Sequence, residues 1–441
     1  MVQQSESQGE FTVGRATRFY IPLLLQAISQ SLTYPLVAAI VSHGANGVKD
    51  YTAFALGQTV MFMIGALGGG LITTGMVFGR DRVGFHNFKR LNIWMAATMT
   101  VLQLMVCLPG IDRFVFHVML GLPDPLWPVA RNTLMMGQVM QIGFFLRNVP
   151  FVALYNARNS AAANMATIFR ILLTALLSPV FVWLGWVGPR WGVVAMTGPV
   201  LLEMALAYRF ALPYIRQLPE GESGAAKLRT QLAFTLPLSF GGFLLATAPS
   251  MIGIFIGHSY DSVQMYAIHI VTIGLANPVG FAALRMQSVV IAYPPRFRGD
   301  TAVFRFGLFS GILLALPLFL LQIPAISEWY FVRVQNLAPE RLGLARQVML
   351  LFTLLPIFQS MRGYAEGLAA CFRRPNAILA GQAMNLASLV CTLAVTLHMG
   401  MRGCFMGVTS VVVACFLTFV TVRLGVAYVL MEPQFGKGID R

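Results

Sequence analysis

The chain has 441 residues, of which 57% are hydrophobic and only 11% are charged, and its mean hydropathy is +0.71. Soluble domains carry about 25% charged residues, so this composition excludes a soluble enzyme. The net charge of +15 arises from 31 Lys and Arg against 16 Asp and Glu. These charges are spread thinly between long apolar runs, which excludes a nucleic-acid-binding surface and points to membrane topology as their origin.

Taken in chain order, twelve runs have the roughly 20 largely apolar residues that a transmembrane helix requires. Six runs precede a polar linker at residues 217–230, and six follow it. We therefore predict an all-α polytopic membrane protein with an N-terminal six-helix lobe (1–216) and a C-terminal six-helix lobe (231–441). The approximate limits of the spans are 17–43, 51–78, 91–110, 126–155, 161–187, 191–213, 231–257, 262–292, 303–325, 343–372, 376–399 and 403–430.

The distribution of Lys and Arg predicts the orientation of these spans. Roughly 21 of them fall on one side of the membrane and 8 on the other, and positively charged loops are retained in the cytoplasm. We therefore expect a multi-pass protein of the cell inner (plasma) membrane with both termini cytoplasmic. We expect no cleavable signal peptide, because the first ten residues are polar and the first apolar run is long enough to span.

The two halves match each other at one constant offset of about 215 residues. Four arginine or histidine pairs recur at this offset, which is hard to obtain by chance. Each half has an even number of spans, so the copies have the same orientation, as in transporters whose substrate site lies between two lobes. The repeat therefore predicts alternating access. The four pairs are His43 with His258, Arg131 with Arg346, Arg147 with Arg362, and Arg158 with Arg373.

Arginines within the spans are the main candidates for substrate binding, because ionisable groups in a bilayer are costly. Arg147 and Arg362 occupy equivalent positions in the two repeats. They either bind a ligand or extend toward the cytoplasmic headgroups, and their pseudo-symmetric placement favours ligand binding. Glu366 follows Arg362 by one helical turn and is expected to neutralise it, which would leave Arg147 the freer cation.

Arg285 is a third candidate, within the long eighth span. It follows the sequence Asn277-Pro278-Val279-Gly280, where we expect a kink and freed carbonyl groups. A broken helix with a cation beyond the break suits an anion site, and a packing kink with an arginine reaching the interface is the alternative. Asn277 is included in the predicted site.

The first span carries a polar stripe at helical spacing that includes Gln26, Gln30 and Tyr34 but no carboxylate. These side chains either line a cavity or hydrogen-bond to neighbouring helices. Arg170 and Glu203 lie in the adjacent fifth and sixth spans, and we interpret them as a structural pair.

No nucleotide-binding loop, catalytic constellation or metal-ligand cluster occurs in the sequence. We therefore predict a protein that is not an enzyme and that uses no cofactor or metal. We expect a monomer whose partners are a small anionic substrate, membrane lipids and, as an open alternative to uniport, a coupling ion.

Four stretches resemble the progressive ankylosis protein (ANKH) family, within the multidrug/oligosaccharidyl-lipid/polysaccharide (MOP) flippase superfamily. The more specific parts are the run from Gly75 to Phe78 with its downstream Arg80-Asp81-Arg82, and the spacing from Pro278-Val279-Gly280 to Tyr293-Pro294. The 6+6 repeat is also similar to multidrug and toxic compound extrusion (MATE) proteins. The other two stretches run from Thr17 to Leu23, and from Leu355 and Pro356 through Arg362 to Gly367.

This resemblance implies a membrane exporter of small polyanions of the citrate, nucleotide triphosphate or pyrophosphate class. The chain departs from vertebrate members in lacking a long acidic C-terminal tail. Three alternatives stay open: a MATE-type multidrug cation antiporter, a lipid-linked saccharide flippase, and a non-transporting membrane scaffold or receptor. The antiporter needs buried carboxylates in its cavities, whereas the flippase would also use the three arginines for a pyrophosphate headgroup.

Overall fold

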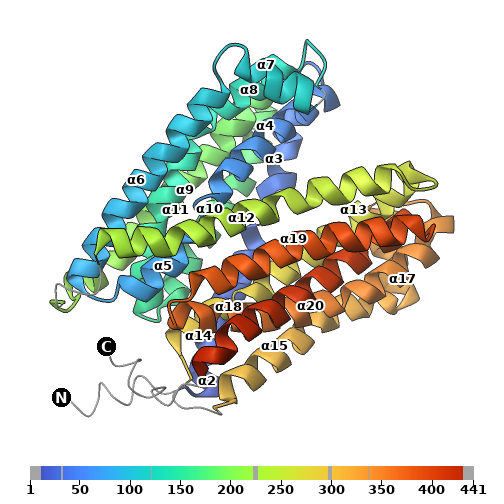
Figure 1. Ribbon diagram of the computed structural model, residues 1–441. Coiled ribbons are helices and arrows are strands. Elements are labelled where there is room, and N and C mark those ends of the chain that lie inside the picture. The colour runs from blue at the N-terminus through green and yellow to red at the C-terminus, as the bar shows by residue number, and fades with distance from the viewer. Residues whose placement is uncertain are drawn as a thin grey trace. The chain divides into compact units, whose positions relative to one another are not determined.

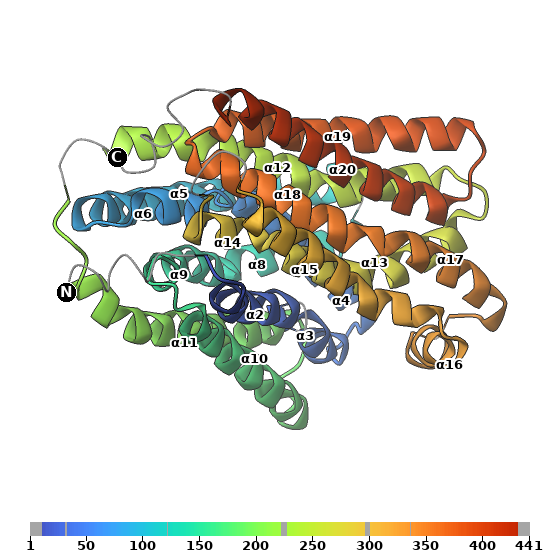
Figure 2. The same ribbon diagram turned by 90° about the horizontal axis from the view of Figure 1, so that it is seen from below.

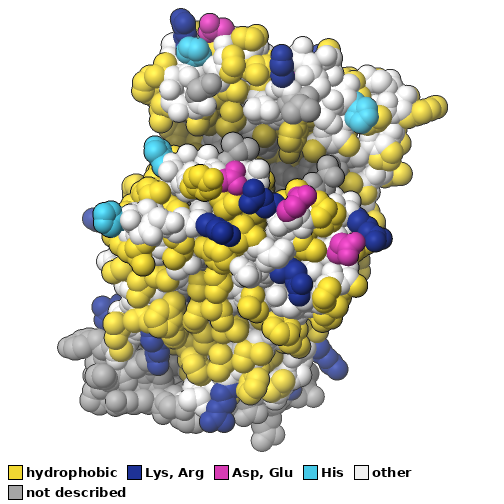
Figure 3. Space-filling model, turned by 90° about the vertical axis from the view of Figure 1, so that its right-hand side faces the viewer, with side chains coloured by type: hydrophobic (Ala, Val, Ile, Leu, Met, Phe, Trp, Pro, Cys, Tyr) yellow, Lys and Arg dark blue, Asp and Glu magenta, His cyan; other side chains and the backbone are white. Residues whose placement is uncertain are grey.

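The computed structural model describes residues 11–30, 33–120, 122–221, 227–295, 300–335 and 337–430. Every regular element within these ranges is a helix, which confirms the predicted all-α class. Hydrophobic side chains cover broad areas of the face drawn in Figure 3, with charged side chains scattered among them. Such an apolar exterior is expected of helices that are surrounded by lipid.

Nine helices in the described residues are long and apolar enough to cross a membrane. A tenth, α6 (Arg82–Val106), is counted when it is taken with the segment Ile111–Met119, which is bent from it by 86°. The first and fourth predicted spans are also helical: α2 (Val13–Gln30) with α3 (Thr33–Ser42), and α8 (Trp127–Met136) with α9 (Gln138–Asn156). Within the described residues, each of the twelve predicted spans therefore overlaps helical structure.

The other elements have the following bounds: α4 (Val48–Ala66), α5 (Leu71–Phe78), α7 (Ile111–Arg113), η1 (Phe114–Met119), α10 (Ser160–Trp183), α11 (Pro189–Arg216), α12 (Leu228–Gly257), α13 (Ser262–Leu284), α14 (Met286–Ala292), α15 (Ala302–Phe319), η2 (Leu320–Gln322), α16 (Pro324–Ser327), η3 (Glu328–Val334), η4 (Pro339–Arg341), α17 (Leu342–Phe352), α18 (Leu354–Cys371), α19 (Pro375–His398) and α20 (Gly403–Leu430).

Packing divides the chain into two compact units. The N-unit comprises residues 29–243, and the C-unit comprises residues up to 28 together with those from 244 onward. Helix α12 begins in the N-unit and ends in the C-unit, where α19 and α20 lie along each other (Figure 1). The unit boundaries fall within helices and not at the predicted linker 217–230, of which 222–226 are outside the described residues. The predicted lobes 1–216 and 231–441 stay a prediction.

Aromatic contacts explain why α2 packs with the C-unit. The ring of Phe19 meets that of Tyr293 edge-on at 6.1 Å. In the N-unit, Phe234 of α12 meets Phe78 edge-on at 5.2 Å. Phe19 and Phe234 are one repeat apart, and so are Phe78 and Tyr293. The first helix of each repeat therefore makes the same aromatic contact within its unit.

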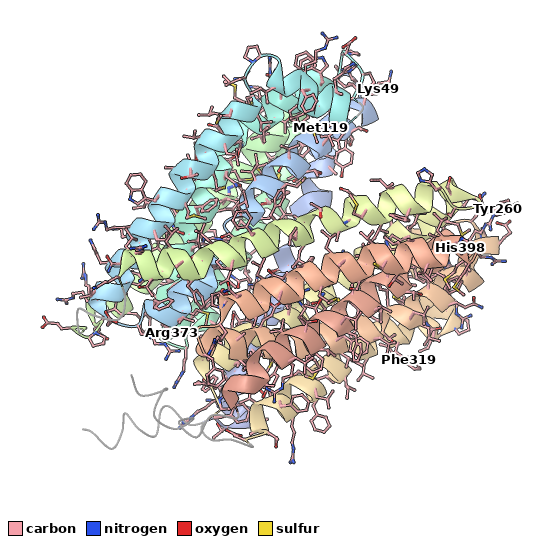
Figure 4. All side chains as sticks on the ribbon, in the orientation of Figure 1. Lys49, Met119, Tyr260, Phe319, Arg373 and His398 are labelled. Atoms are coloured by element: carbon pink, nitrogen blue, oxygen red, sulfur yellow. The ribbon has the colours of Figure 1, made fainter. Side chains whose placement is uncertain are left out.

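The backbone repeats at the same offset. Helices α10 and α19 both have 24 residues, and their bounds shift from 160 to 375 and from 183 to 398. Arg158 and Arg373 adopt the left-handed backbone conformation, with φ of 56° and 54°. Gly185 and Gly400 also have positive φ, of 70° and 68°. Figure 4 shows Arg373 and His398 at opposite ends of α19. The predicted internal repeat is thus confirmed in the local structure.

Glycines in the second predicted span allow close helix packing. A Cβ atom at Gly65 in α4 would lie 2.8 Å from Nε2 of Gln141 in α9, and one at Gly68 would contact the ring of Phe145. The span is broken between α4 and α5 at this point. The close approach places the middle of α9 inside the N-unit, where Arg147 is buried.

Candidate functional site

A buried charged cluster joins α9, α10 and α11, which pack together in the N-unit (Figure 2). The carboxylate of Glu203 accepts hydrogen bonds from Nη1 of Arg147 at 2.5 Å and from Nη1 of Arg170 at 3.3 Å. The hydroxyl of Thr167 donates to the other carboxylate oxygen at 2.5 Å. We refer to Arg147, Thr167, Arg170 and Glu203 as the Glu203 cluster.

The Glu203 cluster carries one surplus positive charge, because two guanidinium groups share one carboxylate. Arginine stays protonated in proteins, and the Arg147 and Arg170 ion pairs with Glu203 are both buried. The guanidinium carbon of Arg147 also lies 4.8 Å and 5.0 Å from the ring centroids of Phe144 and Phe151. Aromatic faces attract a cation at such distances.

The structure corrects one expectation about Arg147. The predicted pair of Arg170 and Glu203 is confirmed, but Arg147 is not the freer cation, because it binds the same carboxylate. Arg147 and Glu203 are 56 residues apart in the sequence. Their contact depends on how α9 and α11 are rotated about their axes, which apolar composition alone does not specify.

Arg362, the repeat partner of Arg147, is neutralised within its own helix as predicted. Its Nε donates to Glu366 at 2.7 Å, one turn further along α18, and both side chains are buried. The position equivalent to Glu366 in the N-unit is Phe151. The two pseudo-symmetric arginines are therefore stabilised differently, one by a carboxylate on its own helix and the other by a carboxylate on a neighbouring helix.

The third arginine, Arg285, lies at a helix break, but not at the predicted place. Helix α13 continues through Asn277 and Pro278 and ends at Leu284, so Arg285 itself is the junction with α14. Helix α18 approaches closely here, since a Cβ atom at Gly363 would lie 2.7 Å from the carbonyl oxygen of Leu284. Arg285 is half-buried and forms no ion pair within the part of the chain that the structure describes.

The remaining predicted site residues are only partly described. Gln26 is buried in α2 and belongs to the C-unit with Arg285 and Arg362. Asn277 is half-buried in α13 of the same unit. The side chains of Gln30 and Tyr34 lie outside the described residues. Arg147 belongs to the N-unit.

Sequence reasoning missed Glu203 as the partner of Arg147 and Thr167 as a donor to Glu203. The signal that was available is the repeat: the positions equivalent to Arg170 and Glu203 are Asn385 and Thr418, which are both neutral. Over the residues that the structure describes, no three His, Cys, Asp or Glu side chains are grouped so as to hold a metal ion.

No protein-family model matches the sequence, and no curated protein matches it. Solved structures of similar fold do exist. A MOP superfamily transporter from Pyrococcus furiosus, described by a binding pocket of reverse polarity that suggests a different function, matches with a TM-score of 0.73 at 15% identity, over 95% of this chain and 96% of that chain.

An outward-facing multidrug resistance MATE transporter of the MOP superfamily also has a TM-score of 0.73, at 16% identity over 94% and 95% of the two chains. A eukaryotic MATE transporter has a TM-score of 0.69, at 12% identity over 97% of each chain. The chain therefore has the fold of MATE transporters of the MOP superfamily along nearly its whole length, as predicted.

Proposed function

We propose that the protein is an alternating-access secondary transporter that exports small organic or phosphate-bearing anions, and that it is not an enzyme. The fold supports the transporter class, because the similar structures are described as transporters. The surplus positive charge of the Glu203 cluster supports the sign of the substrate. A buried guanidinium that is not fully compensated attracts carboxylate or phosphate groups and offers them two parallel donors.

The buried carboxylates favour an anion carrier over a cation antiporter. Three carboxylates are buried in the described parts of the long helices. Asp50, in the first turn of α4, accepts hydrogen bonds from Asn46, whereas Glu203 and Glu366 are both bound to arginine. A cationic drug could bind to Glu203 or Glu366 only by displacing a guanidinium group. The reverse pocket polarity described for the Pyrococcus furiosus transporter is a precedent for differing polarity within this fold.

The substrate class, the membrane and its orientation, the oligomeric state and the energy source are part of the same proposal. The resemblance to the ANKH family supports substrates of the citrate, nucleotide triphosphate or pyrophosphate class. The excess of Lys and Arg on one side supports the inner (plasma) membrane with cytoplasmic termini. We propose a monomer, and a gradient or exchange as the energy source.

Uptake into inside-out proteoliposomes tests the proposed function. Labelled citrate, ATP and pyrophosphate are supplied to wild type and to Arg147→Ala, Arg285→Ala and Arg362→Ala, with the exposed Arg113→Ala as the matched control. We expect saturable uptake of at least one anion. Arg147→Ala should raise KM by about 10- to 100-fold, since charged hydrogen bonds contribute about 1.5–3 kcal/mol. Arg113→Ala should match wild type.

Two results would contradict the proposal. Transport of an organic cation without anion flux would identify a cation antiporter, and translocation of a lipid-linked saccharide without anion flux would identify a flippase. Unchanged anion uptake in all three arginine variants would show that these arginines do not bind the substrate.

A further inference from the structure

The contact that the Glu203 cluster makes between α10 and α11 has a neutral counterpart in the C-unit. At the equivalent level of the C-unit, α19 and α20 are joined by a neutral hydrogen bond from Nδ2 of Asn385 to the hydroxyl of Thr418, at 2.9 Å. Asn385 and Thr418 replace Arg170 and Glu203. Burying charges costs several kcal/mol per ion, so a charged version of a contact that also works uncharged points to a role beyond packing.

Within the Glu203 cluster, Arg147 is the residue whose side chain can move away from Glu203 while both carboxylate oxygens keep a hydrogen-bond donor. One oxygen of Glu203 accepts from both Arg147 and Arg170, and the other accepts from Thr167. If Arg147 turned away, Arg170 and Thr167 would still donate to both oxygens. The Arg147 side chain is also the more exposed of the two, at 11% against 4% for Arg170, whereas that of Glu203 is fully buried.

Arg147 retains donors for an incoming group. Its Nε is buried and has no hydrogen-bond partner among the described residues. Its guanidinium lies beside the rings of Phe144 and Phe151 on its own helix, so the cation stays favourably placed when its carboxylate partner changes. A carboxylate or phosphate group is the ligand that a planar guanidinium group with an unused donor binds best.

We propose that Glu203 is an internal competitor of the transported anion: it occupies Arg147 when no substrate is bound, and a carboxylate or phosphate group of the substrate displaces it. This inference rests on the proposed function and names the exchange step at its site. Glu203 is then a positioning residue that acts through Arg147. The apparent affinity equals the intrinsic affinity multiplied by the fraction of time that Arg147 is free of Glu203, and recapture of Arg147 by Glu203 speeds release.

The double variant Glu203→Gln with Arg170→Gln separates competition from bulk charge. It removes one charge of each sign, so the Glu203 cluster keeps its surplus of +1 while Arg147 loses its competitor. Transport of whichever of citrate, ATP or pyrophosphate wild type takes up is then measured. We expect KM to fall by about tenfold and kcat to fall by about threefold or more, because substrate binds more tightly and leaves more slowly.

Two comparisons define the control. Adding Arg147→Ala to the double variant should abolish the fall in KM. Glu328→Gln, which removes an exposed carboxylate from η3, should leave both constants at their wild-type values. If the double variant does not purify in folded form, Glu203→Asp keeps the charge but shortens its reach, and KM should then fall about two- to threefold.

Failure of this inference differs from failure of the proposed function. Suppose that wild type transports an anion and that the double variant, or Glu203→Asp in its place, shows an unchanged or higher KM. The proposed exchange is then wrong, whereas the proposed transport function is supported. If wild type transports none of these anions, the proposed function and the exchange both fall.

Discussion

At the scale of single residues, Glu203 and Thr418 occupy equivalent repeat positions, yet only Glu203 is charged. Each accepts a hydrogen bond from the preceding helix, from Arg170 and Asn385 respectively. The same helix–helix contact thus exists in two chemical forms within one chain. This internal comparison shows that a contact at this repeat position can be made with or without charged side chains.

The repeat supplies its own substitution test. Replacing Arg170 by Asn together with Glu203 by Thr gives the N-unit the neutral contact of the C-unit. We expect this double variant to melt at a higher temperature in detergent than Glu203→Thr alone, because it takes the Glu203 carboxylate from one buried guanidinium group, that of Arg147, and not from two. The selectivity for anions should change in both variants. Glu203→Thr alone removes the carboxylate that two buried guanidinium groups share and should cost about 3–5 kcal/mol. A double variant that is no more stable than this single variant would show that the charges are structural.

The residue pairs show how far the sequence predicts the site. Arg362 with Glu366 was predictable, because residues four apart share a helical face, and Arg170 with Glu203 was predictable from adjacent spans. The bond from Arg147 to Glu203 was not, because spans that are apolar all round give no periodic signal for which side faces a neighbour. The shared carboxylate therefore required the three-dimensional structure.

At the scale of elements, the sequence predicts where a helix ends better than where a helix is broken. The sequence predicts a span at 376–399 and the structure has α19 at Pro375–His398, since loop residues mark its ends. The break in the eighth span was expected at Asn277–Gly280 but lies at Arg285. Proline tends to bend a helix at its own position, whereas this break lies where α18 packs against α13 and α14 through Gly363.

The close approach at Gly363 predicts a large difference between two glycines. A Cβ atom at Gly363 would lie 2.7 Å from the Leu284 carbonyl oxygen, whereas one at Gly343 would meet nothing within 4 Å. Gly363→Val should therefore destabilise the protein by about 1–3 kcal/mol through overpacking. Gly343→Val, in the same predicted span, should cost about 0.5 kcal/mol or less. Thermal unfolding in detergent measures both, and equal losses would contradict the packing of α18 on α14.

At the scale of the whole molecule, the orientation in the membrane is the prediction that single cysteines can test. Tyr260 is 93% exposed and lies near His398, at the end of the C-unit opposite Arg373 (Figure 4). We expect an impermeant maleimide to label Tyr260→Cys in right-side-out vesicles. Arg373→Cys should react only after permeabilisation, and the unsubstituted chain reports labelling of its native cysteines. The reverse pattern would invert the topology.

The sign of the transported charge is the central claim, and counterflow in proteoliposomes tests it most directly. Vesicles are loaded with unlabelled citrate, ATP or pyrophosphate, or with an organic cation, and accumulation of the same labelled compound is followed. We predict counterflow with at least one anion, none with the cation, and loss of the anion signal in Arg147→Ala but not in Arg113→Ala. Counterflow with the cation alone would contradict the account, leaving the fold intact and its function reassigned.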